Sequence, residues 1–165
     1  MIYFDNAATT FPKPEEVYSF TDQFYRSYGV NAGRGQYNLS YEASMLVENT
    51  RELLLDLFHS SNKQVVFTHS ATEALNIILQ GLSISDNCNI YLSPFEHNAV
   101  TRVIHHLAQT YKINIHHLDV DIKTFCYDLE KIKYQFASNR PNLVVISHAS
   151  NVCGLIAPVR EICEL

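Results

Sequence analysis

Three polar segments follow directly after short apolar, β-branched runs of the chain. They read FTHSATEALN (residues 67–76), SPFEHNA (93–99) and SHASNVCG (147–154). Ligands of parallel-sheet proteins usually bind at the edge of the sheet where the strands end. We therefore expect the three segments to meet at one edge of a sheet and to form a single binding site.

The first segment contains a candidate anion site at Ser70, Ala71 and Thr72. These residues lie where a strand is expected to give way to a helix, and Ser70 and Glu73 have the spacing of a capping box. Unpaired backbone N–H groups, the Thr72 hydroxyl and the positive end of the helix can converge on a phosphate. The alternative is an ordinary helix N-cap, the commoner role of an isolated Ser-Ala-Thr-Glu sequence. The two neighbouring segments favour the anion site.

The second and third segments contribute His97 and Asn151. The imidazole of His97 would lie at the carboxyl edge of the sheet, where it could stack on a flat cofactor or relay a proton. The Asn151 amide could donate to a phenolate oxygen or a carboxylate at the same edge, and Gly154 then allows a sharp turn. The alternatives are a surface histidine at a helix start and an Asx-turn asparagine.

The spacing of the apolar residues predicts alternating helices and strands. Helices are expected over 14–28, 40–59, 71–80, 98–111, 128–136 and 158–165, and strands over 65–67, 89–92, 113–118 and 142–146. Such alternation predicts an α/β fold, a three-layer αβα arrangement with a mostly parallel sheet covered by helices on both faces.

Composition and charge exclude several classes of function. The net charge is -5, and the 12 basic residues are scattered, so we expect neither nucleic acid nor a membrane surface as a partner. The four cysteines form no CxxC pair, the histidines show no ligand spacing, and we expect no metal site. The N-terminal sequence MIYFDNAATT lacks the features of a signal peptide, which predicts a cytoplasmic protein.

Five segments in order along the chain match the signatures of one family. They are YFDNAATT (3–10), NAGRGQYNLS (31–40), FTHSATEALN (67–76), EHNAV (96–100) and SNVCGLIAPV (150–159). With them the sequence resembles the class V aminotransferases, pyridoxal phosphate (PLP) enzymes of fold type I. Within that family it is most similar to the cysteine desulfurases and selenocysteine lyases. The resemblance spans nearly the whole chain.

The resemblance implies roles for individual residues in cofactor binding. Ala71 and Thr72 correspond to the phosphate-binding pair, His97 to the ring that stacks over the pyridine, and Asn151 to the donor to the phenolic oxygen. Two departures from the family pattern are Ser70, where glycine is common, and Tyr37, which is often histidine.

The resemblance also implies a substrate-proximal group formed by Ala8, Asn31 and Arg34. Asn31 and Arg34 would belong to the mouth of the substrate site, and the small side chains of Ala7 and Ala8 would leave room for a small amino acid. The alternative for the two alanines is close packing of the N-terminal arm.

The Schiff-base lysine of the family has no counterpart in the chain. Lys13, Lys63, Lys112, Lys123, Lys131 and Lys133 lie outside any matching motif, and we interpret them as ordinary exposed residues. We therefore expect residues 1–165 to be the N-terminal arm and the first part of a PLP-binding large domain. On this expectation the chain is truncated, and the rest of that domain and a C-terminal small domain are absent.

The expected activity is that of a cysteine desulfurase, which converts L-cysteine to L-alanine and an enzyme-bound persulfide. The persulfide would serve iron–sulfur cluster assembly through a sulfur-acceptor protein, and the full-length enzyme would be a homodimer. The 165 residues alone are predicted to be inactive. One alternative is selenocysteine lyase or another class V aminotransferase activity, and the other is a non-catalytic fragment or assembly module.

Overall fold

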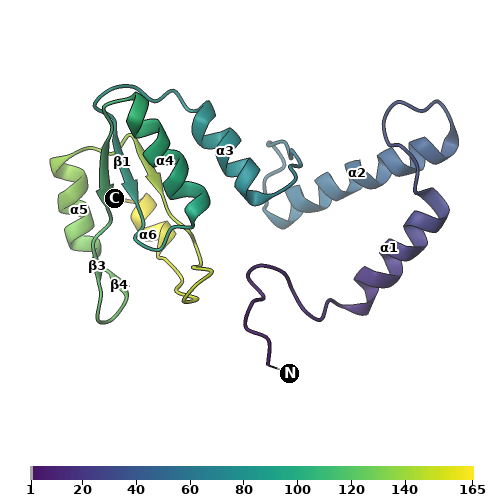
Figure 1. Ribbon diagram of the computed structural model, residues 1–165, viewed down its shortest axis with the longest axis horizontal. Coiled ribbons are helices and arrows are strands. Elements are labelled where there is room, and N and C mark those ends of the chain that lie inside the picture. Colours follow the sequence, from purple (N-terminus) through teal and green to yellow (C-terminus); the bar gives the residue numbers. More distant parts are fainter. Residues whose placement is uncertain (1) are drawn as a thin grey trace. The chain divides into compact units, whose positions relative to one another are not determined.

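The computed structural model describes residues 2–165, which divide into two compact units (Figure 1). The first unit ends at Phe67, and the second comprises Thr68–Leu165. None of the helices in the described residues combines the length and apolarity needed to cross a bilayer.

The first unit contains two long helices, α1 (Glu15–Tyr28) and α2 (Asn38–Leu57). Both were predicted to within about two residues. The signals for α1 are the proline that precedes it and Gly29, which follows it. Along α1 the Phe20 and Phe24 rings stack with 6.4 Å between their centroids. The four-residue spacing of these aromatic residues therefore places their rings side by side on one face of the helix.

The prediction that Ser40 opens the second helix was wrong. The helix begins two residues earlier, and the buried Ser40 hydroxyl instead fixes the preceding connector. Ser40 Oγ donates to the Asn31 carbonyl (2.9 Å) and accepts from the Gly35 N–H (3.2 Å). A β-carbon on Gly35 would lie 2.5 Å from Ser40 Oγ, so this close approach requires glycine.

The predicted strand over 65–67 is also wrong, because these residues are extended but pair with no strand in the described part of the chain. The run is β-branched, which favours extended backbone. A strand also needs a hydrogen-bonding neighbour, and Val66 remains 80% exposed.

The second unit is built on a parallel sheet with the strand order β2-β1-β5. The strands are β1 (Asn89–Leu92), β2 (Asn114–His117) and β5 (Leu143–Val145). In the register, Leu92 lies opposite both His117 and Val145. The three strands therefore end at the same level, and the residues that follow them share one edge.

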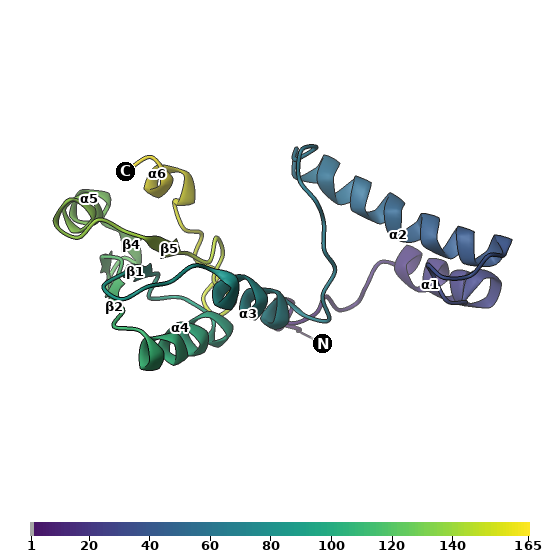
Figure 2. The same cartoon turned by 90° about the horizontal axis from the view of Figure 1, so that it is seen from above.

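Helices cover both faces of this sheet, as predicted (Figure 2). On one face lie α3 (Ala71–Gly81) and α4 (Asn98–Thr110), and on the other lie α5 (Leu129–Ser138) and α6 (Val159–Cys163). Ile90 and Leu92 point into the core with α3 and α4, and Tyr91 points into the core with α5 and α6. This alternation follows from the two-residue period of a strand and confirms the three-layer αβα arrangement.

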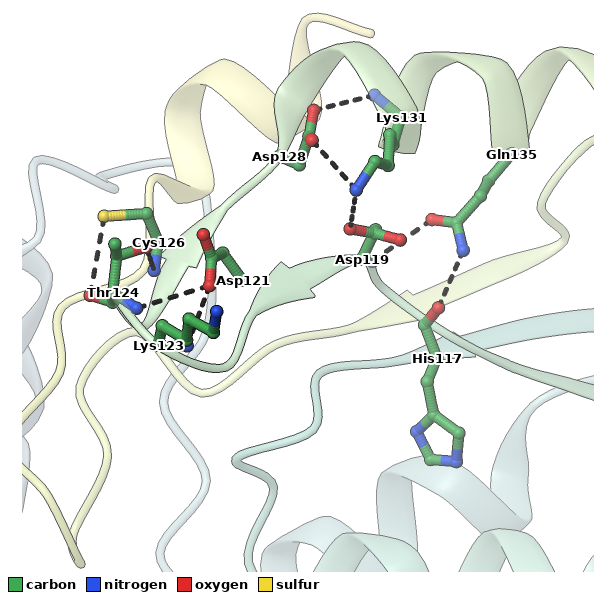
Figure 3. Close-up of polar contacts among 9 residues, drawn as sticks. All are labelled: His117, Asp119, Asp121, Lys123, Thr124, Cys126, Asp128, Lys131 and Gln135. Atoms are coloured by element: carbon green, nitrogen blue, oxygen red, sulfur yellow. Dashed lines mark hydrogen bonds and ion pairs between the residues drawn. The ribbon is translucent and has the colours of Figure 1, made fainter.

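A short hairpin of β3 (Val120–Asp121) and β4 (Cys126–Tyr127) was not predicted. Asp121 holds its turn, since Oδ1 accepts from the Lys123 N–H at 2.7 Å (Figure 3). Each strand has only two residues, too few to show an alternating pattern.

Charged and polar side chains attach α5 to the segment after β2 (Figure 3). Lys131 Nζ lies 3.2 Å from Asp119 Oδ1 and 3.3 Å from Asp128 Oδ2. Gln135 Nε2 donates to the His117 carbonyl at 2.9 Å. Lys131, predicted to be an ordinary surface residue, is therefore exposed but paired in a local ion network.

Candidate functional site

The N-terminus of α3 carries the predicted anion site. Ser70 is the N-cap residue, and its Oγ accepts from the Glu73 N–H at 3.2 Å. Glu73 does not complete the predicted capping box on Ser70, because its Oε2 accepts from the His69 N–H (2.8 Å) and contacts the His69 ring (2.9 Å). The backbone hydrogen bond, with the ring contact second, lowers the pKa of Glu73.

The N-cap leaves donors free for a ligand. Among the described residues, the backbone N–H groups of Ala71 and Thr72 and the Thr72 hydroxyl have no hydrogen-bond acceptor. The Thr72 carbonyl accepts from Asn76 Nδ2 at 2.8 Å. Two N–H groups and a hydroxyl at a positive helix end are therefore available to an anion.

His97 is the N-cap of α4, which fixes its ring. Its Nδ1 accepts from the Ala99 N–H at 3.0 Å, so in the neutral ring the proton is assigned to Nε2. The turn before it is anchored by the buried Ser93, whose Oγ accepts from the Phe95 N–H at 3.1 Å. The residue remains exposed, and no hydrogen bond of its Nε2 occurs within residues 2–165.

Thr72 and His97 line the same pocket, which has a volume of about 490 Å³ and lies between α3 and α4. Its other lining residues are mainly polar: Asn76, Gln80, Asn98, Ala99, Arg102, Val103 and His106. The volume lies within the range of small-molecule sites. A larger pocket of about 620 Å³ lies against α5, β5 and α6, and its lining is mostly apolar, with Lys133 and Arg140 as its charged residues.

The pocket is lined by the Thr72 hydroxyl at the positive end of α3 and by His97, whereas Ala71 does not line it. A hydroxyl at a helix N-terminus favours an anion such as a phosphate. The pocket lining contains no lysine among the described residues.

The third predicted segment forms a tight loop after β5. The Ser150 N–H donates to the Leu155 carbonyl and the Gly154 N–H to the Ser150 carbonyl, both at 2.9 Å. Gly154 has a φ of +69°, as its predicted turn requires. Asn151 is exposed at the tip and does not line the pocket of Thr72 and His97.

The Asn151 side chain does not form the alternative Asx-turn. No hydrogen bond of its amide occurs within residues 2–165, and the turn is held instead by Ser150 Oγ. This oxygen accepts from the Val152 and Cys153 N–H groups at 3.3 and 3.4 Å. The role of Asn151 as a cofactor contact stays a prediction.

Sequence reasoning missed a contact between the second and third segments. The Glu96 carboxylate accepts from the Ser147 backbone N–H and, at 2.9 Å, from the Ser147 hydroxyl. Burial raises the pKa of Glu96, and the hydrogen bonds from Ser147 oppose that rise. A glutamate before a helix start gives no sequence signal of a partner 51 residues away.

The predicted substrate-proximal residues, Ala8, Asn31 and Arg34, all lie in the first unit and are exposed there. The Ala8 N–H donates to the Asp5 carbonyl at 3.1 Å. Arg34 stands between Gly33, with a φ of +109°, and the close-packed Gly35. The alternative of close packing for Ala7 and Ala8 is not observed in the described residues, and their link to a substrate stays a prediction.

No group of three or more His, Cys, Asp or Glu side chains within residues 2–165 is arranged to hold a metal ion. All four cysteines of this part of the chain are free thiols, and only Cys88 is buried.

Comparison with known proteins identifies relatives over the whole chain. The family model "Aminotransferase class-V" matches residues 2–165. A "Probable cysteine desulfurase" from Halalkalibacterium halodurans is 30% identical over 169 residues, which cover 100% of this chain and 41% of the relative. The chain thus spans about two fifths of the length of such curated relatives.

Solved structures agree with the fold. The apo cysteine desulfurase from Thermococcus onnurineus NA1 has a TM-score of 0.88 at 28% identity, covering 99% of this chain and 40% of its own. A C-DES variant with glycine covalently linked to its PLP cofactor has a TM-score of 0.68 at 19% identity, covering 91% and 38%. The second likeness shows the fold alone. Together the neighbours confirm the predicted PLP-transferase-like αβα fold.

Proposed function

The chain belongs to the class-V aminotransferase family, and we propose that the full-length protein is a PLP-dependent cysteine desulfurase. It would take sulfur from L-cysteine and leave L-alanine. The observation that carries the proposal is the pocket shared by Thr72 and His97. The pocket lies in a chain whose relatives and solved neighbour are cysteine desulfurases.

Within this proposal the residues of the chain bind and orient. The N–H groups of Ala71 and Thr72 and the Thr72 hydroxyl would hold the phosphate at the start of α3. His97, whose Nδ1 accepts from the Ala99 N–H, would offer its ring to the pyridine. Asn151, which lies outside the pocket of Thr72 and His97, would donate to the phenolic oxygen. When bound, PLP supplies the electron sink for reaction at the amino acid.

The overall reaction balances with one thiol of the enzyme as sulfur acceptor. L-cysteine and an enzyme thiol give L-alanine and an enzyme persulfide, so the carbon–sulfur bond of cysteine breaks and a sulfur–sulfur bond forms. We assign the acceptor to none of Cys88, Cys126, Cys153 and Cys163, since none matches the family's acceptor motif. Ala8, Asn31 and Arg34 are proposed to lie near the amino-acid substrate.

Family membership also supports proposals about location, oligomeric state, partner and domain organisation. We propose a cytoplasmic homodimer that passes persulfide sulfur to an acceptor protein for iron–sulfur cluster assembly. We also propose that residues 1–165 are the N-terminal arm and the first part of the PLP-binding large domain.

The proposal is tested by supplying the purified full-length protein with PLP and L-cysteine. Alanine and, in the presence of a reductant, sulfide are expected in equal amounts. A parallel assay with L-selenocysteine tests the alternative, because a selenocysteine lyase would act on L-selenocysteine in preference to L-cysteine. A protein that retains no PLP after gel filtration would refute the proposal.

Thr72→Ala provides the residue-level test of the phosphate site. Loss of a hydrogen bond to a charged group is worth about 1.5–3 kcal/mol, so PLP affinity should fall at least about tenfold. Thr110→Ala, at the far end of α4, is the matched control. Equal PLP titrations of the Thr72 variant and the wild type would mean that the α3 start serves only as a helix cap.

A further inference from the structure

One carboxylate joins the turn that carries His97 to the loop that carries Asn151. Glu96 follows β1, Ser147 follows β5, and the two are 51 residues apart in sequence. Both carboxylate oxygens are used on Ser147, one for its backbone N–H and one for its hydroxyl. A two-point contact of this kind fixes the orientation of Glu96 relative to Ser147 as well as the distance between them.

The turn on the His97 side is internally fixed. The Glu96 N–H donates to the Ser93 carbonyl at 3.4 Å, and the Phe95 N–H donates to Ser93 Oγ at 3.1 Å. Ser93 is 2% exposed, and its hydroxyl lies 2.7 Å from the Tyr127 hydroxyl on β4. Because His97 directly follows Glu96 and caps α4, displacement of Glu96 would displace the His97 ring.

The loop on the Asn151 side is also internally fixed. The Ala157 N–H donates to the His148 carbonyl at 2.8 Å, and Ala149 forms an isolated bridge with Ile156. Together with the hydrogen bonds around Ser150, these contacts make residues 148–157 one compact loop. Ser147 is the point at which the loop leaves the sheet, so a contact at Ser147 sets the orientation of the loop.

We propose that Glu96 is a positioning residue of the cofactor site, which clamps the Asn151 loop to the His97 turn through Ser147. The identity of the cofactor rests on the proposed function. The clamp itself consists of contacts within the protein and requires no bound molecule.

The chemistry of the clamp predicts which substitutions it tolerates. Ser147 presents two donors, and a carboxylate accepts both. Glutamine keeps one acceptor for the N–H and can donate to the Ser147 hydroxyl, which is able to reverse its role. Glu96→Gln should therefore preserve the clamp, whereas Glu96→Ala removes both contacts.

Amide hydrogen exchange on the PLP-free full-length protein tests the clamp directly. In Glu96→Ala the amides of residues 147–157 should exchange about tenfold faster, while in Glu96→Gln they should stay within about twofold of wild type. Glu130→Ala, which removes an exposed carboxylate on α5, is the control. Unchanged exchange in Glu96→Ala would overturn the proposal.

PLP binding tests whether the clamp positions the cofactor contacts. Glu96→Ala should weaken PLP severalfold and change the visible circular dichroism of bound PLP, and Glu96→Gln should restore both. Adding Ser147→Ala to Glu96→Ala should have little further effect, because both changes break the same contact. If the losses of PLP affinity in the double variant were fully additive, or if Glu96→Ala left the circular dichroism of bound PLP unchanged, the positioning role would be overturned.

The two proposals fail in different ways. If the wild-type protein binds no PLP, the proposed function is wrong, and with it the role of the clamp at a PLP site. The exchange measurement still decides whether Glu96 holds the Asn151 loop.

Discussion

At the scale of single residues, helix capping and ligand binding use different groups of the same helix end. Ser70 satisfies the Glu73 N–H, while the N–H groups of Ala71 and Thr72 stay free. His97 likewise uses Nδ1 to cap α4 and leaves its ring face and Nε2 available. The two interpretations offered by the sequence, cap or ligand site, are therefore compatible at both positions.

The Ser70 cap makes a prediction about local stability. Ser70→Ala should cost about 1 kcal/mol, because the Glu73 N–H loses its acceptor. Amides in the first turn of α3 should then exchange about fivefold faster. Ser83→Ala, an exposed serine beyond the helix, is the control, and equal exchange in both variants would show that Ser70 does not stabilise the helix.

The raised pKa of Glu96 predicts a pH dependence of stability. The ordinary value is 4.5, and burial keeps the folded protein protonated at Glu96 to higher pH than the unfolded chain. The contribution of Glu96 to stability should therefore fall as pH rises from about 4.5 through its folded-state pKa and stay constant above it. Glu96→Gln cannot titrate and should lack this decline.

Unfolding free energies of wild type and Glu96→Gln, measured between about pH 4 and pH 7, check this prediction. The Tyr127 phenol contacts the Ser93 hydroxyl near Glu96 in sequence, and burial raises its pKa, so Tyr127 stays protonated over this pH range. Parallel pH curves for the two proteins would show that Glu96 titrates alike in the folded and unfolded states.

At the scale of elements, the sequence predicted those structures whose signals are local. The six helices appear within about two residues of their predicted starts because apolar spacing, prolines and caps are read from neighbouring residues. The strand over 65–67 fails because strand formation depends on a partner that no local pattern reveals. The β3–β4 hairpin was missed because it is held by the Asp121 turn rather than by an alternating pattern.

Tyr91 links the central strand to α5 and gives a prediction at this scale. Its side chain is 1% exposed, and its hydroxyl lies 2.9 Å from both the Gln135 and Asn139 carbonyls. Tyr91→Phe removes the donor and should destabilise the protein by about 1–2 kcal/mol. Tyr134→Phe, 69% exposed on α5, should change the unfolding free energy by less than about 0.5 kcal/mol.

Denaturant unfolding of the two variants under the same conditions measures this difference. A Tyr91→Phe protein as stable as Tyr134→Phe would mean that water replaces the hydroxyl at the end of α5.

At the scale of the whole molecule, the pairing of Thr72 with His97 was predictable from the helices that they open, although the strand expected over 65–67 does not form. Thr72 and His97 meet because their segments open α3 and α4 on one face of the sheet. The Glu96–Ser147 clamp was not predictable, because it depends on the packing of two loops far apart in sequence. The position of Asn151 outside the pocket was not predictable either, because its loop is held by contacts among residues 148–157 that the sequence pattern did not reveal.

The last prediction concerns the 165-residue chain taken by itself. With PLP and L-cysteine it should release no more sulfide than PLP alone. The pocket of Thr72 and His97 offers phosphate and ring contacts, but no lysine lines it among the described residues, so it lacks the amine that would hold the cofactor covalently. The full-length protein in the same assay is the positive control, and free PLP gives the background. Sulfide release by the 165-residue chain above that background would show that a lysine within these residues reaches the site.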